Sequence, residues 1–140
     1  MGMHLVVGVD GSEHSRRALD LARDMARKMD GALTLVSTYE MPTFPIQDYG
    51  LTAERVRQQE LERIHDMLLS LAEEMRDVPV TTVLETGDPA EVLCRLAVER
   101  GADLVVVGSR GLGRFRAMLV GSVSRRVVEM SSKPVLVVRE

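Results

Sequence analysis

The chain has 140 residues, 45% of them hydrophobic and 28% charged, with a formal net charge of −3. These values are typical of a single globular domain spanning residues 1–140 and exclude a disordered chain, and no apolar run approaches the ~20 residues that cross a membrane. The single cysteine, Cys94, excludes an internal disulfide, and the acidic net charge argues against a basic surface for nucleic acid. The N-terminus lacks a signal-peptide pattern, so we expect a cytoplasmic protein.

The first part of the chain predicts a strand, a helix and a second strand. The apolar run LVVGV at 5–9 is typical of a buried strand, and a helical period follows over 12–29, with Ser12 as its N-cap. We expect Gly31 to end this helix and residues 32–38 to form the next strand. The positions expected to face the core are Ala18, Leu21, Ala22, Met25 and Met29.

Residues 39–50 (YEMPTFPIQDYG) hold two prolines and both tyrosines, and predict a loop. Its length of about a dozen residues is near the upper limit for compact domains, where lids and interface segments occur. A long helix follows and ends near Arg76. Its expected core stripe is Leu61, Ile64, Leu68, Leu71 and Met75.

The second half continues the alternation of strands and helices. A third strand at 80–85 leads into a helix that Asp88 caps, with Pro89 at its first position, and that stops at Gly101. The unbroken apolar run at 104–108 indicates a strand buried on both faces. A short helix at 121–131 and a final strand at 134–138 complete the pattern.

Five strands alternating with four helices predict an α/β fold: one open, Rossmann-like parallel sheet with helices on both faces. We expect the strand order 3-2-1-4-5, in which the order reverses between the first and fourth strands. Ligands of such sheets bind in the crevice at the carboxyl ends of the strands beside that reversal. Residues 9–12 and 108–111 would line this crevice.

The stretch VVVGSRGLGRFRAMLVGSVS at 105–124 has glycines spaced for an anion site. It lacks the G-x-x-x-x-G-K-[ST] and G-x-G-x-x-G patterns, but Gly111 and Gly113 permit a turn whose N–H groups point at an anion. Gly121 and Ser122 start the last helix, whose N-terminus favours phosphate, and Ser124 adds a hydroxyl.

Charge along the chain points to the same segment. Residues 108–126 contain five arginines and no acidic residue, which leaves −8 on the remainder of the chain. Within the segment, Arg110 and Arg114 would supply positive charge to a small anionic ligand.

Asp10 follows the first strand, directly across the predicted crevice from the glycines. A carboxylate at this place accepts hydrogen bonds from ribose hydroxyls in dinucleotide-binding sheets. The alternative is a turn residue, because Asp-Gly is a common turn signal. We favour the sugar-binding role once the loop across the crevice is counted.

Three segments resemble the universal stress protein family: VGVDGSEHSRRALDLA, ETGDPAEVLCRLAVERGADLVVVGSRG, and the spacing G-x-x-G-(nine residues)-G-S. The resemblance spans the chain, and the intact glycine signature is similar to that of the ATP-binding subgroup. It implies ATP with Mg²⁺ or Mn²⁺, ribose at Asp10 and adenine near the backbone of Thr38. It further implies sugar and phosphate contacts from Val107, Gly108, Gly111, Gly113, Gly121, Ser122, Val123 and Ser124.

The expected function is a nucleotide-dependent regulatory module of the stress response, with little or no hydrolysis. Asp10 is the one acidic residue that the sequence assigns to the crevice, so no catalytic base is evident. The resemblance implies a homodimer joined through the terminal strand at 134–138, whose apolar edge would need a partner. Alternatives are a dimeric interaction scaffold without nucleotide, a site for AMP or cyclic AMP, and an adenylating or phosphotransfer enzyme.

Overall fold

A computed structural model describes residues 2–40, 52–109 and 122–139 of the chain. The elements run β1 (His4–Gly8), α1 (Glu13–Lys28), β2 (Ala32–Tyr39), α2 (Ala53–Glu74), β3 (Val80–Thr86), α3 (Pro89–Glu99), β4 (Leu104–Gly108), α4 (Ser122–Met130) and β5 (Val135–Val138). These bounds lie within about three residues of the predicted ones at every end that the sequence assigned.

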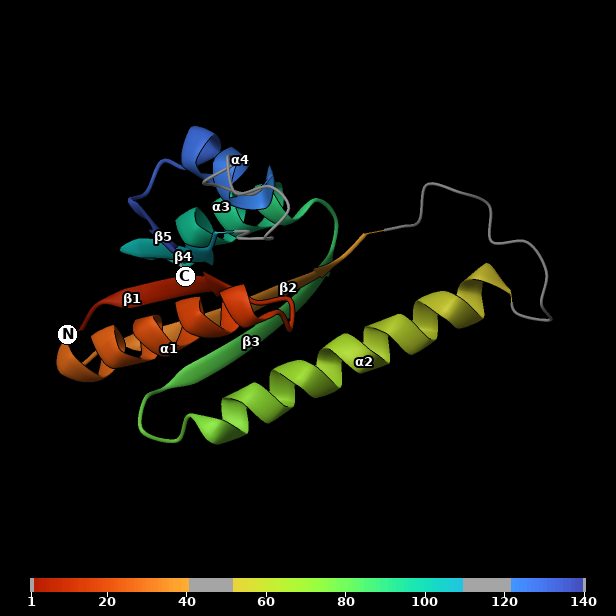
Figure 1. The fold of residues 1–140 in the computed structure, drawn as a ribbon, viewed down its shortest axis with the longest axis horizontal. Helices are drawn as coiled ribbons and strands as arrows, with labels where there is room; N and C mark the ends of the chain where they lie inside the picture. The colour runs from red at the N-terminus through yellow and green to blue at the C-terminus, as the bar shows by residue number, and fades with distance from the viewer. Residues whose placement is uncertain (1, 41–51, 110–121, 140) are drawn as a thin grey trace.

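The five strands form one parallel sheet in the order β3-β2-β1-β4-β5, which confirms the predicted topology. Helices α1 and α2 lie against one face, and α3 and α4 lie against the other (Figure 1). The central strand β1 is buried on both faces because its side chains alternate between the two cores. Leu5 and Val7 enter one core and Val6 enters the other, all with 0% exposure.

The buried face of α1 differs from the predicted one. Leu19 and Ala26 are fully buried, whereas Leu21 and Met29 are 39% and 49% exposed. The helix turns a row of small residues to the sheet, with Ala18 and Ala22 beside Ala26. The predicted stripe was wrong at two positions because it followed the larger apolar side chains, while the alanines allow the closer approach to the sheet.

The two ends of β2 also depart from the sequence-based prediction. The prediction that Gly31 ends α1 is close, because the helix stops at Lys28 and Asp30, with φ of 51°, adopts the left-handed conformation just before Gly31. Tyr39, predicted in a loop, ends β2 and is 5% exposed, since it pairs with Thr86 of β3. Residues 41–51, the rest of that loop, lie outside the described residues.

Helix α2 keeps the predicted stripe. Ile64 and Leu68 are buried, while Leu61 and Leu71 are partly buried against the same core. Met75 closes the stripe just past the helix, with 1% exposure. The N-terminal turns of α2 extend beyond the sheet on the side where β2 ends (Figure 1). The helix therefore flanks the edge of the sheet at which a ligand site is expected.

Candidate nucleotide site

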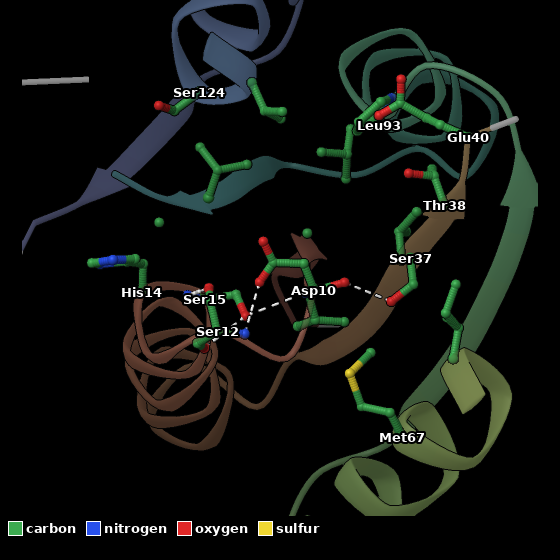
Figure 2. Close-up of a pocket in the computed structure, with 18 of the residues that line it drawn as sticks. Asp10, Ser12, His14, Ser15, Ser37, Thr38, Glu40, Met67, Leu93 and Ser124 are labelled. Carbon is green, nitrogen blue, oxygen red and sulfur yellow. Dashed lines mark hydrogen bonds between the residues drawn. The ribbon is translucent and has the colours of Figure 1, made fainter. Parts of the chain in front are cut away.

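A cleft of about 680 Å³ lies at the carboxyl edge of the sheet, where the strand order reverses between β1 and β4. Its walls come from the ends of β1, β2 and β4, from the first turns of α1, α3 and α4, and from the middle of α2. Figure 2 shows Asp10 in the middle of this site, between His14 and Ser124 on one side and Thr38 and Glu40 on the other. The predicted crevice is therefore present and large enough for a small ligand.

Asp10 is held in a tight turn between β1 and α1. The backbone N–H of Ser12 donates to Asp10 Oδ1 at 2.9 Å, and the N–H of Asp10 donates to Ser15 Oγ at 3.2 Å. Gly11 has φ of 86°, a conformation that side chains disfavour, and a Cβ there would lie 3.1 Å from Met67 Sδ. Ser12 caps α1 by accepting from the N–H of Ser15 at 3.2 Å, as predicted.

The Asp10 carboxylate is exposed to the cleft and charged at neutral pH. Partial burial raises its pKa, but hydrogen bonds from Ser12 and Ser15 outweigh that effect, and the pKa falls below its ordinary value. A carboxylate that stays ionised is a strong hydrogen-bond acceptor. It suits a ligand that presents hydroxyl groups or a metal ion.

The side of the cleft beyond β2 includes apolar side chains from both faces of the sheet. Leu93 and Pro89 of α3 contribute from one face of the sheet, and Ile64 and Met67 of α2 contribute from the other. Thr38 is half-buried at this end, as the sequence placed it. Apolar side chains of this kind can pack against a flat heterocycle.

The opposite side is formed by β4 and α4. Val107 and Gly108 line it, with Ser122, Val123 and Ser124 from the start of α4. A Cβ on Gly108 would lie 2.4 Å from the carbonyl oxygen of His14, so β4 and α1 touch through this glycine.

Five predicted site residues, Arg110, Gly111, Gly113, Arg114 and Gly121, lie outside the described residues. The cationic cluster is smaller than the sequence indicated. Arg126 pairs with Asp88, and Arg125 lies 3.6 Å from Glu129. Both carboxylates lie outside residues 108–126, so two of the five arginines in that segment are already engaged.

Several residues that line the cleft were missed from the sequence. Asp10 is not alone, because the acidic residues Glu13, Glu40 and Glu60 also contribute, as does His14. Glu60 accepts hydrogen bonds from Arg63, which lower its pKa against a small opposing effect of burial. In the sequence, the serines that follow Asp10 were the one local sign of these neighbours. The α2 residues had no such sign, because α2 reaches the site through tertiary packing alone.

Within the described residues, no group of three or more His, Cys, Asp or Glu side chains could hold a metal ion. The same part of the chain contains no helix long and apolar enough to cross a membrane.

The sequence profile described as the universal stress protein family matches residues 1–139. The chain belongs to this family. It is 31% identical to the universal stress protein YxiE of Bacillus subtilis, over 96% of this chain and 97% of that protein.

Solved structures of this family share the fold. A universal stress protein solved in complex with cAMP superposes with a TM-score of 0.73 at 29% identity, covering 98% of this chain and 97% of that one. A family protein from Arabidopsis thaliana, solved with AMP bound, gives 0.61 at 20% identity, covering 99% and 92%.

Proposed function

We propose that this universal stress protein is a regulatory module of the stress response that binds an adenine nucleotide, with ATP as the preferred ligand. The ionised Asp10 carboxylate carries the proposal, because it stands at the strand-order reversal in the middle of a cleft of about 680 Å³. One side of that cleft offers apolar side chains from α2 and α3, and the other lies at the start of a helix. This is the arrangement that a ribose with a flat base and an anionic tail requires.

In the proposed pose, the ribose hydroxyls donate to Asp10 and the base lies between Leu93 and Met67, near the backbone of Thr38. Val107 and Gly108 would contact the sugar and first phosphate. The phosphates would extend toward Ser122, Val123 and Ser124 at the start of α4, where N–H groups and the helix dipole favour negative charge. The family resemblance adds Gly111, Gly113 and Gly121 to the phosphate side, and the charge of the segment adds Arg110 and Arg114.

Mg²⁺ or Mn²⁺ would accompany ATP. The described residues are compatible with these ions, since the Ser122 hydroxyl on the phosphate side is a hard oxygen ligand. Mg²⁺ at nucleotide sites is typically held by phosphate oxygens, with few protein ligands. Binding of the metal should therefore depend on the nucleotide.

A second ligand class has specific support. The relative solved with cAMP is 29% identical to this chain and shares its fold. The described part of the cleft does not show how many phosphates the site accommodates, so AMP and cAMP are the competing ligands. The remaining alternative is a scaffold that binds no nucleotide.

We further propose that turnover is slow or negligible, and that the protein is a cytoplasmic homodimer joined through β5. Support for the dimer comes from Val135–Val138, an edge strand whose four apolar residues are each only half-buried. A second copy of the strand would cover them. The single cysteine, unable to form an internal disulfide, fits a reducing compartment.

The test is to purify the protein, denature it and identify released nucleotide by mass spectrometry, then titrate ATP, AMP and cAMP by calorimetry with Mg²⁺. We expect ATP near one equivalent per chain. Asp10→Ala and Gly111→Val should each abolish retention, the first by removing the ribose acceptor and the second by blocking the phosphate approach.

Asp103→Asn is the matched control. Asp103 lies at the opposite edge of the sheet, where it accepts from the N–H of His4 at 2.8 Å. An amide oxygen can keep that bond, so this variant should retain nucleotide. Absence of nucleotide from the wild type, with no binding of any of the three ligands, would leave the scaffold as the function.

A further inference from the structure

Helix α4 forms one wall of the cleft but has little apolar packing to hold it. It has nine residues, and Val127 is its one fully buried apolar side chain. Val123, Val128 and Met130 are 37–52% exposed. Ser124, in the first turn, is the other buried residue of the helix. With so few buried side chains, a second anchor outside the cleft can help to fix the position of the helix.

Arg126 supplies that second anchor. Its guanidinium pairs with Asp88 through Nη1, and Nη2 lies 4.0 Å from the Glu91 carboxylate. Both acidic residues belong to the start of α3. The hydrogen bond and the charge of Asp88 raise the pKa of Arg126, and in turn Arg126 helps to lower the pKa of Asp88, against the opposing effect of burial.

Asp88 is itself fixed to the other wall of the cleft. Its carboxylate caps α3 by accepting from the N–H of Glu91 at 3.0 Å, directly before the cleft residue Pro89. The preceding residue, Gly87, donates its N–H to the carbonyl of Tyr39 at 2.9 Å, at the end of β2 beside Thr38. Asp88 thus connects α4 to the part of the cleft where the base is proposed to bind.

We infer that Arg126 is a positioning residue for the nucleotide: its pair with Asp88 sets the distance between the phosphate wall on α4 and the base wall on α3. Arg126 does not line the cleft, whereas Ser122 and Val123, which precede it by about one helical turn, do. The inference rests on the proposed function. It adds a determinant of affinity outside the glycine signature.

A purely structural role and a positioning role differ in what they change. If the pair only stabilised the fold, its loss would lower the melting temperature but leave the affinity of the folded protein unchanged. If it positions α4, the dissociation constant measured well below the melting temperature rises. Calorimetric titration with ATP and Mg²⁺ at 20 °C separates the two cases.

The decisive variant is Asp88→Ser. Serine keeps the N-cap of α3 but is too short to reach Arg126. Removing a negative charge near the cleft should strengthen binding of an anion by simple electrostatics, whereas loss of the pair should weaken it. We expect the dissociation constant of Asp88→Ser, and that of Arg126→Ala, to rise about two- to fivefold.

The double variant should bind no more weakly than either single variant, because both remove the same interaction. Arg125→Ala is the matched control. Arg125 has the same charge and the neighbouring position, but it pairs with Glu129 within α4. Its side chain is 68% exposed, so solvent screens its charge, and its removal should weaken binding less than that of Arg126 does.

Cys94 gives a readout that needs no nucleotide. Its Sγ lies 4.0 Å from the carbonyl oxygen of Val127, at the contact of α3 with α4. If α4 loosens, alkylation of Cys94 should be faster in Arg126→Ala. Loss of the nearby positive charge by itself would raise the thiol pKa and slow the reaction, so a faster rate reports the loosening.

Unchanged or tighter binding by Asp88→Ser, in a wild type that binds ATP, would overturn the positioning role and leave the proposed function intact. A wild type that binds no nucleotide would overturn both. If Arg126→Ala does not fold, Asp88→Ser alone decides.

Discussion

The packing of α1 on the sheet requires glycine at position 108, a requirement that the sequence pattern around Gly108 does not reveal. Gly108 belongs to the glycine pattern predicted to bind phosphate, yet its missing side chain also makes room for α1, since a Cβ would lie 2.4 Å and 2.6 Å from the carbonyl oxygen and carbon of His14. Backbone atoms cannot turn away as a side chain can. A Cβ on Gly8, at the end of the neighbouring strand, would meet side chains alone: Leu93 at 3.0 Å and, at an ordinary contact distance, Val107 at 3.6 Å.

Gly108→Ala should therefore destabilise the protein without any ligand, by about 1–3 kcal/mol, as overpacking does. Gly8→Ala is the matched control and should cost less than about 1 kcal/mol, because Leu93 can change rotamer. Urea unfolding at pH 7 measures both. Equal midpoints for the two variants would contradict the assignment of Gly108 to helix packing.

At the scale of the elements, α1 depends on its first turn. Ser12 caps the helix and also forms the turn that carries Asp10, so the helix start and the candidate site share one side chain. The cap is local and was predicted from the sequence. The face that α1 turns to the sheet is set by three alanines, and the sequence did not predict it correctly.

Ser12→Ala should lower the free energy of unfolding by about 0.5–2 kcal/mol, because the N–H of Ser15 loses its acceptor. Ser12→Asn should restore most of the loss, since asparagine is an equally good cap. Thermal unfolding followed by circular dichroism gives the comparison. Equal destabilisation by both variants would mean that the hydroxyl acts elsewhere.

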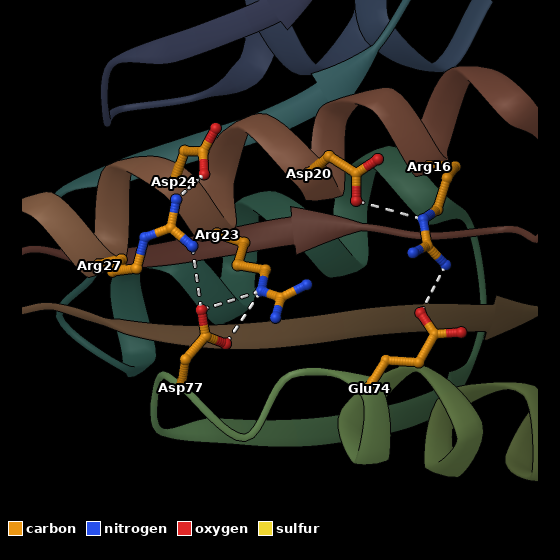
Figure 3. A network of polar contacts seen from close by, with 7 residues as sticks. All are labelled: Arg16, Asp20, Arg23, Asp24, Arg27, Glu74 and Asp77. Carbon is orange, nitrogen blue, oxygen red and sulfur yellow. Dashed lines mark hydrogen bonds and ion pairs between the residues drawn. The ribbon is translucent and has the colours of Figure 1, made fainter.

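At the scale of the whole molecule, ion pairs tie α1 to the end of α2 across one face of the sheet (Figure 3). Asp77 accepts from Arg23 at 2.9 Å and from Arg27 at 3.3 Å, and Arg16 reaches Glu74 at 2.7 Å. Partial burial raises the pKa of Asp77, but the bonds from Arg23 and Arg27 lower it more. The network connects segments about 50 residues apart in sequence.

A lowered carboxyl pKa stabilises the folded state above the ordinary value of 3.8 and stops doing so as the pH falls through the folded value. Asp77→Asn should therefore lower the urea midpoint at pH 7 but have little effect at pH 2–3. Asp66→Asn, at a carboxylate that is 81% exposed, is the control and should have little effect at either pH. An Asp77→Asn effect of equal size at both pH values would contradict this account.

The sequence by itself determined the order of the elements, the strand order and the edge of the sheet where the site lies. Strand and helix periods, caps and right-handed crossovers are local or follow from chain connectivity, and they are readable without coordinates. They were sufficient to place Asp10 and Ser122 in one cleft, whereas Thr38 and Val107 were assigned to it by the family resemblance.

Only the tertiary structure decided which other side chains meet there. Met67 and Glu60 reach the cleft because α2 extends past the end of β2, and Arg126 meets Asp88 from 38 residues away. The tertiary structure also pairs Arg125 and Arg126 with carboxylates, which partly neutralises their positive charge. Contacts between distant segments depend on the exact packing of helices on the sheet, and no local pattern encodes that packing.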